Sequence, residues 1–313
     1  MSDATSLDHL KPASSIFRPH FIQARGARLR AATFPSGTTT DRLCVLLNGQ
    51  TEFIEKYFEV IDELRARGFC VVTMDWRGQG GSGRLLPDPL KVHIDDFSEY
   101  DDDLASLLEQ VVAPLTSAAP VALAHSMGGH IILRALRDKP GRFSRVILSA
   151  PMIAVSARGT PPWLARIATW VFSASGQRDQ WVFGMQARDP LHMGFESQIV
   201  TSDRARFQRT QDFITREPQI RVAGPTWGWL EAAYESMREM QRPGYAETIS
   251  TPTLVFGSGR DRICMTAAAR AFAARMPKGE FVLLDDAEHE ILMENDSIRT
   301  RFWKAFDAFV DRS

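Results

Sequence analysis

Two patterns of hydrophobic and polar positions alternate along most of this chain, and together they predict a parallel β-sheet covered by helices. Short apolar runs of strand length are followed by longer segments in which apolar residues recur at helical spacing. The expected strands are residues 20–34 (an opening hairpin), 42–49, 69–76, 120–126, 145–151, 251–258 and 280–286. The expected helices are residues 57–68, 97–114, 127–141 and 266–277, with a closing helix in which Ile298, Phe302, Phe306 and Phe309 line one face.

The alternation stops after Ala150 and returns only near the carboxyl end of the chain. In between, residues 152–245 carry helical patterns with scattered Trp, Phe and Met and no convincing strand. We therefore expect an α/β core formed by residues 1–151 and 246–313, interrupted by a helical cap over 152–245. Residues 1–16 are expected to be a flexible tail of that core. Because the insertion begins where a strand ends, the cap should lie over that edge of the sheet.

Composition and charge argue against several classes of protein. The 313 residues contain 37 basic and 38 acidic side chains, a balance that gives no basic surface for nucleic acid. The three cysteines form no CxxC pair and lie in or beside apolar runs, so we expect reduced, packed thiols, no metal and no cofactor. Since the sequence shows neither a signal peptide nor an apolar stretch of the roughly 20 residues that span a membrane, we expect a cytoplasmic protein. Peripheral membrane contact through the cap and the oligomeric state are left open.

The apolar run 120–126 ends in His-Ser, followed by two glycines and then a helix. Ala124, Ser126 and Gly128 reproduce the motif G-x-S-x-G with Ala in the first position, a spacing that lets serine occupy a strained turn between strand and helix. The helix would direct its free N–H groups and positive dipole end at the serine oxygen. Alone, the pentapeptide fits a glycine-rich turn with an N-cap serine equally well. Its position after a strand and before a helix favours a nucleophile.

A serine nucleophile needs a general base, and the base needs an acid to orient it. With this motif the three follow in the chain order Ser, Asp or Glu, His. Asp261 lies in the Gly-Ser-Gly loop after the run 251–258, and His289 follows the run 280–286. Both positions are just beyond the carboxyl ends of expected strands, where such sheets bind ligands. We therefore predict Ser126 as nucleophile, His289 as general base and Asp261 as the orienting acid.

Each of these residues also has a simpler interpretation. Asp261 alone fits a turn carboxylate paired with Arg260 or Arg262, and the histidine alone fits a solvated loop residue. Asp285 and Asp286 are rival acids, although they end a strand and would have to turn back. The other histidines either flank the serine or lack a strand-end context. The order and context of all three residues together favour the triad.

Residues 78–83, GQGGSG, match the dinucleotide-binding pattern G-x-G-x-x-G after a strand. That fingerprint must open directly into a helix, whereas Pro87 and Pro89 follow here. We interpret the segment as a shaped loop beside the active site, with Asp75 and Arg77 as structural polar anchors.

The segments LLNGQTEFIEKY, MDWRGQGGSGR, AHSMGGH, GPTWGWL and GSGRDRIC…AEHEIL resemble the bacterial lysophospholipase and monoacylglycerol lipase branch of the α/β-hydrolases, from about Phe21 to the carboxyl terminus. The resemblance implies the α/β-hydrolase fold and an oxyanion hole formed by the backbone amides of Gln50 and Met127. Asn48 replaces the histidine common in the monoacylglycerol lipases and favours the lysophospholipase side. Ala124 replaces the first elbow glycine and is small enough to preserve activity.

The cap region contains five of the seven tryptophans. Most of them fit a small core of the cap itself, but an apolar cap also suits a single acyl chain. The resemblance implies a serine hydrolase acting on the carboxylic ester of a mono-acylated lipid, with a lysophospholipid first and monoacylglycerol second. No basic cluster for a phosphate stands out, although Arg158, Arg166 and Arg178 lie in the cap. The alternatives are a general carboxylesterase, a proline-type peptidase and a non-catalytic binding protein on the same scaffold.

Overall fold

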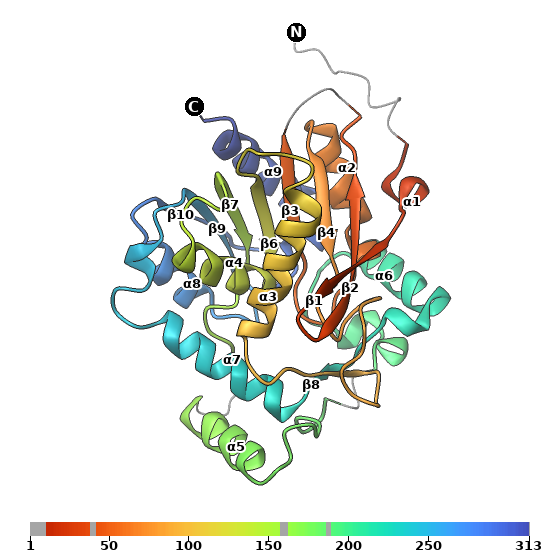
Figure 1. Ribbon diagram of the computed structural model, residues 1–313, viewed down its shortest axis with the longest axis vertical. Coiled ribbons are helices and arrows are strands. Elements are labelled where there is room, and N and C mark those ends of the chain that lie inside the picture. The colour runs from red at the N-terminus through yellow and green to blue at the C-terminus, as the bar shows by residue number, and fades with distance from the viewer. Residues whose placement is uncertain (1–10, 38–41, 157–161, 186–188, 313) are drawn as a thin grey trace.

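Among the residues described by the computed structural model, eight strands form one sheet in the order β1-β2-β4-β3-β6-β7-β9-β10 (Figure 1). The β1–β2 and β2–β4 pairs are antiparallel, and the other neighbouring pairs are parallel. The prediction of a mostly parallel sheet is confirmed. The structure describes residues 11–37, 42–156, 162–185 and 189–312. The strands are β1 His20–Ala24, β2 Ala27–Phe34, β3 Leu43–Leu47, β4 Cys70–Met74, β6 Val121–His125, β7 Arg145–Ser149, β9 Thr253–Ser258 and β10 Gly279–Leu284.

Helices cover both faces of this sheet, and each face has its own core (Figure 1). Along β3, Val45 and Leu47 belong to one core and Cys44 and Leu46 to the other, because successive side chains of a strand point to opposite faces. A strand buried on both faces therefore reads as a continuous apolar run. The first core includes α3 Ser98–Leu107, α4 Met127–Asp138 and α8 Thr266–Ala273, and the second includes α2 Phe58–Ala66 and α9 Asp296–Val310. The expected stripe of α9 is buried in the second core.

The segment between β7 and β9 contributes the helices α5 Pro162–Ala174, α6 Arg204–Arg216 and α7 Trp227–Met240. It also contains the short strand β8 (Gly224–Pro225), which pairs in parallel with β5 (Lys91–Val92). The sequence did not predict this pair because two residues are too few to show a strand pattern. The cap boundaries at 152 and 245 remain a prediction.

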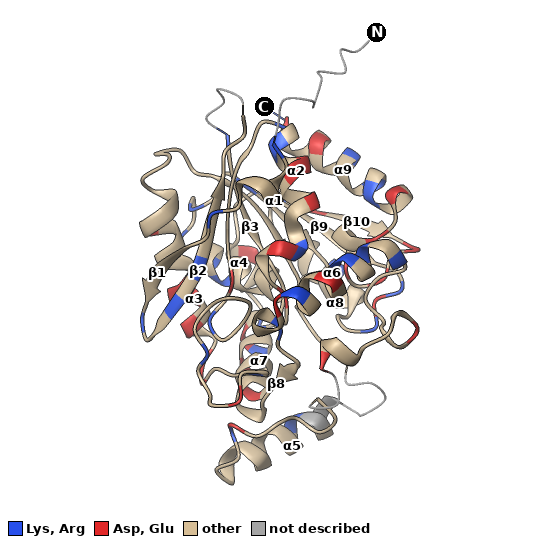
Figure 2. Cartoon of the chain, turned by 90° about the vertical axis from the view of Figure 1, so that its right-hand side faces the viewer, with Lys and Arg blue, Asp and Glu red and all other residues tan. Residues whose placement is uncertain are grey.

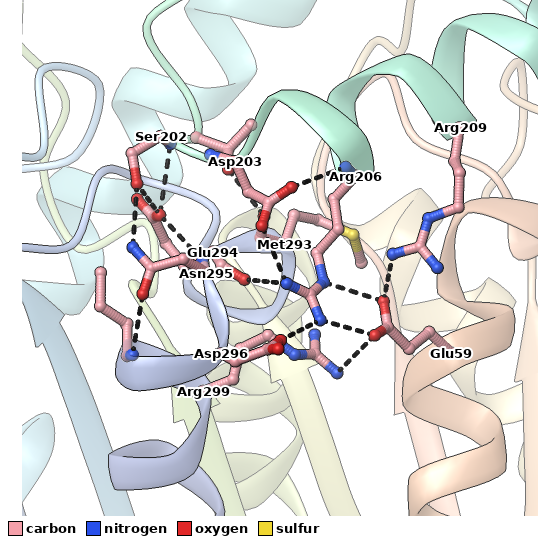
Figure 3. Close-up of polar contacts among 12 residues, drawn as sticks. Glu59, Ser202, Asp203, Arg206, Arg209, Met293, Glu294, Asn295, Asp296 and Arg299 are labelled. Atoms are coloured by element: carbon pink, nitrogen blue, oxygen red, sulfur yellow. Dashed lines mark hydrogen bonds and ion pairs between the residues drawn. The ribbon is translucent and has the colours of Figure 1, made fainter.

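Two arginines of the helix α6 form ion pairs with carboxylates of the core. Arg206 forms ion pairs with Glu59 of α2 and Asp296 of α9, each at 2.6 Å (Figure 3). Arg209 also pairs with Glu59, at 2.5 Å. These contacts connect this part of the insertion to the side of the sheet that carries α2 and α9.

The expectation of a flexible tail over residues 1–16 is wrong for its last residues. Ala13–Ile16 forms the short helix α1, and Ala13 is fully buried. Its N–H donates to Asp62 of α2 at 2.8 Å, and Arg65 donates to the carbonyl of Lys11 at 2.7 Å. The remainder of the expected tail, residues 1–10, lies outside the described residues.

Candidate active site

Ser126 occupies the sharp turn between β6 and α4. Its φ of 49° and ψ of −114° are strained for a residue with a side chain. Three backbone hydrogen bonds hold this conformation: the Ser126 N–H donates to Ser149 at 3.0 Å, and its carbonyl accepts from His130 at 3.2 Å and Met152 at 3.0 Å. A Cβ at Gly128 would lie 2.6 Å from a carbonyl oxygen just after β3, so glycine lets α4 approach that strand. The backbone thus adopts the turn that the motif spacing predicts.

The structure brings the three predicted residues into one hydrogen-bonded chain. His289 Nε2 lies 3.1 Å from Ser126 Oγ, and His289 Nδ1 lies 2.7 Å from Asp261 Oδ2. The other oxygen of Asp261 accepts the N–H groups of Ile263 and Cys264, both at 2.8 Å, which fixes the carboxylate. Ser126 is 8% exposed and His289 4%. This is the geometry in which an oriented imidazole can remove a proton from a serine hydroxyl.

The surroundings make His289 a stronger base. Burial disfavours its protonated form, but the hydrogen bond and charge of Asp261 outweigh burial and raise the pKa of His289 above 6.5. Burial likewise opposes ionisation of Asp261, yet His289 and two backbone N–H groups hold the pKa of Asp261 below its ordinary value. The ring of His125 lies 4.8 Å from that of His289, and burial lowers the pKa of His125 to about 4. Of these two histidines, His289 is therefore the stronger base.

The residues that competed for these roles have other partners. Asp286 is 47% exposed through its side chain and pairs with Arg301. The Nδ1 atom of His125 lies 3.0 Å from the carbonyl oxygen at the end of β7. His130 lies 2.7 Å from the hydroxyl of Ser236 on α7, so it connects α4 to the cap.

Two backbone segments pass next to the serine. Met127 is the first residue of α4, so its N–H has no partner within the helix. A Cβ at Gly49 would lie only 3.2 Å from the Cβ of Ser126, which places the loop after β3 beside this serine. The loop is where the resemblance puts the oxyanion donor Gln50.

Buried side chains hold that loop on both sides of Gln50. The N–H of Gly49 donates to the carboxylate of Glu52, and the N–H of Thr51 donates to Gln79 Oε1 at 2.6 Å. Thr51 has a φ of 65°, so the loop is strained as well as fixed. Among the described residues, the N–H of Gln50 donates to no acceptor. Neither Glu52 nor Gln79 was predicted to serve the site, because charged and amide side chains in a loop usually indicate a solvated surface.

Cys264 is a neighbour of Ser126 that the sequence did not lead us to expect. Its Sγ lies 3.9 Å from Ser126 Oγ, and burial raises the pKa of the thiol well above its ordinary value. Atoms of Asp261, Cys264 and His289 lie within 4.8 Å of one another. Because Nδ1 of His289 is already engaged by Asp261, this set would offer a metal fewer ligands than a zinc site uses. It fits a hydrogen-bonded triad with a neighbouring thiol better than a metal centre.

The glycine-rich loop after β4 is organised around buried ion pairs. Asp75 accepts the N–H of Gly81 at 2.7 Å and pairs with Arg30 at 2.6 Å. Arg77 pairs with the buried carboxylate of Asp103 at 2.7 Å. These anchors agree with a shaped structural loop rather than a phosphate cradle.

A family model described as serine aminopeptidase, S33, matches residues 38–296, which is most of the chain. The chain belongs to that family. A relative of this S33 member, lysophospholipase L2 of Escherichia coli K12, is 34% identical over 280 residues, covering 87% of this chain and 81% of the relative. The monoacylglycerol lipase of Mycolicibacterium smegmatis is 31% identical over 149 residues, covering 47% of this chain and 51% of the relative.

Solved structures agree with the fold. A soluble variant of monoglyceride lipase from Saccharomyces cerevisiae, in complex with a substrate analogue, has a TM-score of 0.73 at 18% identity and covers 99% of both chains. The monoacylglycerol lipase of Paleococcus ferrophilus has a TM-score of 0.70 at 21% identity, covering 91% of this chain and 99% of that one. At these identities the likeness concerns the α/β-hydrolase architecture.

Proposed function

We propose that this S33-family protein is a serine hydrolase that cleaves the carboxylic ester of a mono-acylated lipid through an acyl-enzyme. The observation that carries the proposal is the unbroken hydrogen-bond chain from Asp261 through His289 to Ser126, with the serine on a strained elbow. A binding protein without catalytic activity would not need these three hydrogen-bonded side chains.

In the acylation step, Ser126 Oγ bonds to the ester carbonyl carbon while its proton moves to His289 Nε2. The N–H groups of Gln50 and Met127 receive the negative charge that develops on the carbonyl oxygen. Asp261 holds the imidazole in the required tautomer and stabilises the imidazolium. The bond between the tetrahedral carbon and the alcohol oxygen then breaks. The departing alcohol oxygen takes the proton from His289, and the acyl group stays on Ser126.

In the deacylation step, water takes the place of the alcohol. His289 accepts a proton from the water as its oxygen attacks the acyl carbon on Ser126. The intermediate collapses, Ser126 Oγ recovers the proton from His289, and the fatty acid leaves. The free enzyme is restored with no other reactant.

The relatives support the choice of substrate class. The match to a lysophospholipase over most of both chains supports a lysophospholipid first, and the shorter match to a monoacylglycerol lipase supports monoacylglycerol second. In the cap, Arg178 is already paired with Asp95 and Glu231. Arg166 is exposed, and Arg158 lies outside the described residues. This supports recognition of the acyl ester more than of a phosphate.

The outer face of α5 supports contact with a lipid surface. The apolar side chains on this outer face are exposed to solvent. On the inner face Phe172 stacks on Trp227, with 4.6 Å between the ring centroids. Figure 2 shows α5 at one end of the molecule with few charged residues. An exposed apolar cluster of this kind marks an interaction site. We call Leu164, Ile167, Trp170, Val171 and Phe183 the α5 surface and propose that it meets membranes or lipid aggregates. None of the described helices is long and apolar enough to span a membrane.

The test compares initial rates of the purified protein on lysophosphatidylcholine, monoacylglycerol, a short nitrophenyl ester and a prolyl amide. Both lipids should be turned over faster than the prolyl amide, with the lysophospholipid first, and Ser126→Ala should lose all four activities. Faster turnover of the prolyl amide than of either lipid would overturn the lipid assignment and leave the triad intact. Full activity of Ser126→Ala would overturn the mechanism.

A further inference from the structure

A buried ion-pair network connects the loop after β3 to the loop that carries His289. Lys56 Nζ lies 2.7 Å from Glu52 Oε1 and 2.6 Å from Glu290 Oε1. The side chains of Lys56, Glu52 and Glu290 are only 7%, 5% and 13% exposed. Burying three charges is costly, and apolar residues of similar size often stabilise a fold as well. We call these three residues the Lys56 network and ask what it does.

One end of the Lys56 network fixes the proposed oxyanion loop. The second oxygen of Glu52 accepts the N–H of Gly49 and the hydroxyl of Tyr57, the latter at 2.7 Å. Gly49 directly precedes Gln50, so Glu52 sets the orientation of the peptide next to the proposed oxyanion donor. A Cβ at Gly49 would lie 2.9 Å from Glu52 Oε2, which shows how closely the carboxylate is packed against the loop.

The other end fixes the loop of the general base. Glu290 is the residue after His289, and its side chain is held by Lys56. Its backbone is held too, because the N–H of Glu290 donates to Val200 at 2.8 Å and its carbonyl accepts from Met293 at 2.7 Å. A movement of Glu290 would therefore move His289.

We infer that the Lys56 network sets the distance between the oxyanion hole and the general base, with Glu52, Lys56 and Glu290 as positioning residues. The inference rests on the proposed function, since it assigns these residues to the same reaction. Acyl transfer requires the base and the oxyanion donors to be placed within fractions of an ångström around one carbonyl. These donors and this base come from loops far apart in the sequence, and Lys56 joins the two loops directly.

The network also affects the charge around His289. The titratable groups that face that ring are Asp261, His125, Cys264, Glu52 and Glu290, and Lys56 and Tyr57 in turn contact Glu52. Despite burial, Lys56 lowers the pKa of Glu52 to about 2. Glu290 and Glu52 both help to raise the pKa of His289. Removing the charge of Glu290 should therefore lower the pKa of His289.

The decisive variant is Glu290→Gln, which keeps the shape and an acceptor for Lys56. We measure kcat, KM and the pH profile of kcat/KM on a short nitrophenyl ester, together with the rate of Ser126 labelling by a fluorophosphonate. We expect kcat to fall about tenfold with KM unchanged, because geometry is lost and no substrate contact is removed. The acidic limb of the profile should move to lower pH. Lys56→Met should lose more activity than Lys56→Arg, which keeps the charge.

The matched control is Glu59→Gln. Glu59 also lies close to Lys56 in sequence and forms ion pairs, but with Arg206 and Arg209 on α6 (Figure 3). This change should leave kcat and the acidic limb as in the wild type. Wild-type kcat and an unshifted limb in Glu290→Gln would overturn the inference while labelling of Ser126 still supports the proposed function. A wild-type protein that neither hydrolyses esters nor labels at Ser126 overturns both.

Discussion

The proposed triad and the α5 surface differ in which side chains they bury: the triad buries polar side chains, and the α5 surface exposes apolar ones. The side chains of Ser126, His289 and Asp261 form one hydrogen-bonded chain, in which His289 is 4% exposed and bonded through both ring nitrogens. On α5 several large apolar side chains are exposed, and Trp170 is 64% exposed. Buried polar groups with all their partners fix a geometry. A cluster of exposed apolar groups marks an interaction site.

The comparison separates two tasks. In the proposed function, the sheet edge holds the reacting groups in a fixed geometry, and the α5 surface is the proposed contact with membranes or lipid aggregates. Changes at the first region should affect turnover of every ester. Changes at the second should affect only substrates presented in membranes or aggregates.

The largest expected effect is that of removing the nucleophile. Ser126→Ala should lower kcat by about a millionfold, the scale seen when a triad loses its serine. The kcat of His289→Ala should fall to a similar level, because the serine hydroxyl cannot transfer its proton without the base. Steady-state rates on a nitrophenyl ester measure both. A fall of less than about a hundredfold in Ser126→Ala would mean that another group attacks the ester.

The acid comes next. Asp261→Asn should lower kcat about ten-thousandfold, because the amide no longer holds the correct imidazole tautomer. Asp286→Asn is the matched control, since Asp286 is half exposed and paired with Arg301. It should behave as the wild type. If instead Asp286→Asn is inactive and Asp261→Asn is active, the acid has been assigned to the wrong strand end.

A smaller effect is expected at the α5 surface. Ile167→Glu combined with Trp170→Glu should weaken binding to phospholipid vesicles by about tenfold or more, because two large side chains lose their burial in lipid. Hydrolysis of a soluble nitrophenyl ester should stay unchanged. Leu115→Glu, at a residue 50% exposed outside the cap, serves as the control. Vesicle sedimentation measures binding, and equal losses in both variants would remove the special role of α5.

The smallest expected effect concerns pH. Since the Asp261 pair raises the pKa of His289, the free base becomes available only above the ordinary value of 6.5. The acidic limb of kcat/KM should therefore lie above pH 6.5. It should have a slope of one, because His125, with a pKa of about 4, stays neutral throughout. A limb below pH 6 would mean that burial outweighs Asp261 at His289.

The sheet and the residues of the triad could be predicted because both leave local patterns. Parallel strands buried on two faces read as apolar runs, and each proposed catalytic residue follows the end of such a run. The small residues around Ser126 are required by the turn itself, as the 2.6 Å approach at Gly128 shows.

Other features depend on contacts between distant segments and leave no local sign. Lys56 and Glu290 are far apart in the sequence and resemble solvated charges, yet they meet in the interior. The α1 helix is too short for a helical pattern, and it is held by a hydrogen bond from its first residue to Asp62 of α2. Cys264 follows Asp261 by three residues, so its position on the same loop was the one available signal for its place beside the serine.

The most direct test of the account is covalent labelling with a fluorophosphonate, followed by peptide mass spectrometry. We predict one label per chain on the peptide that contains Ser126, loss of lysophosphatidylcholine hydrolysis in proportion to labelling, and no label on Ser126→Ala. A label on a different residue, or full hydrolysis by a fully labelled protein, would contradict the assignment of Ser126 as the nucleophile.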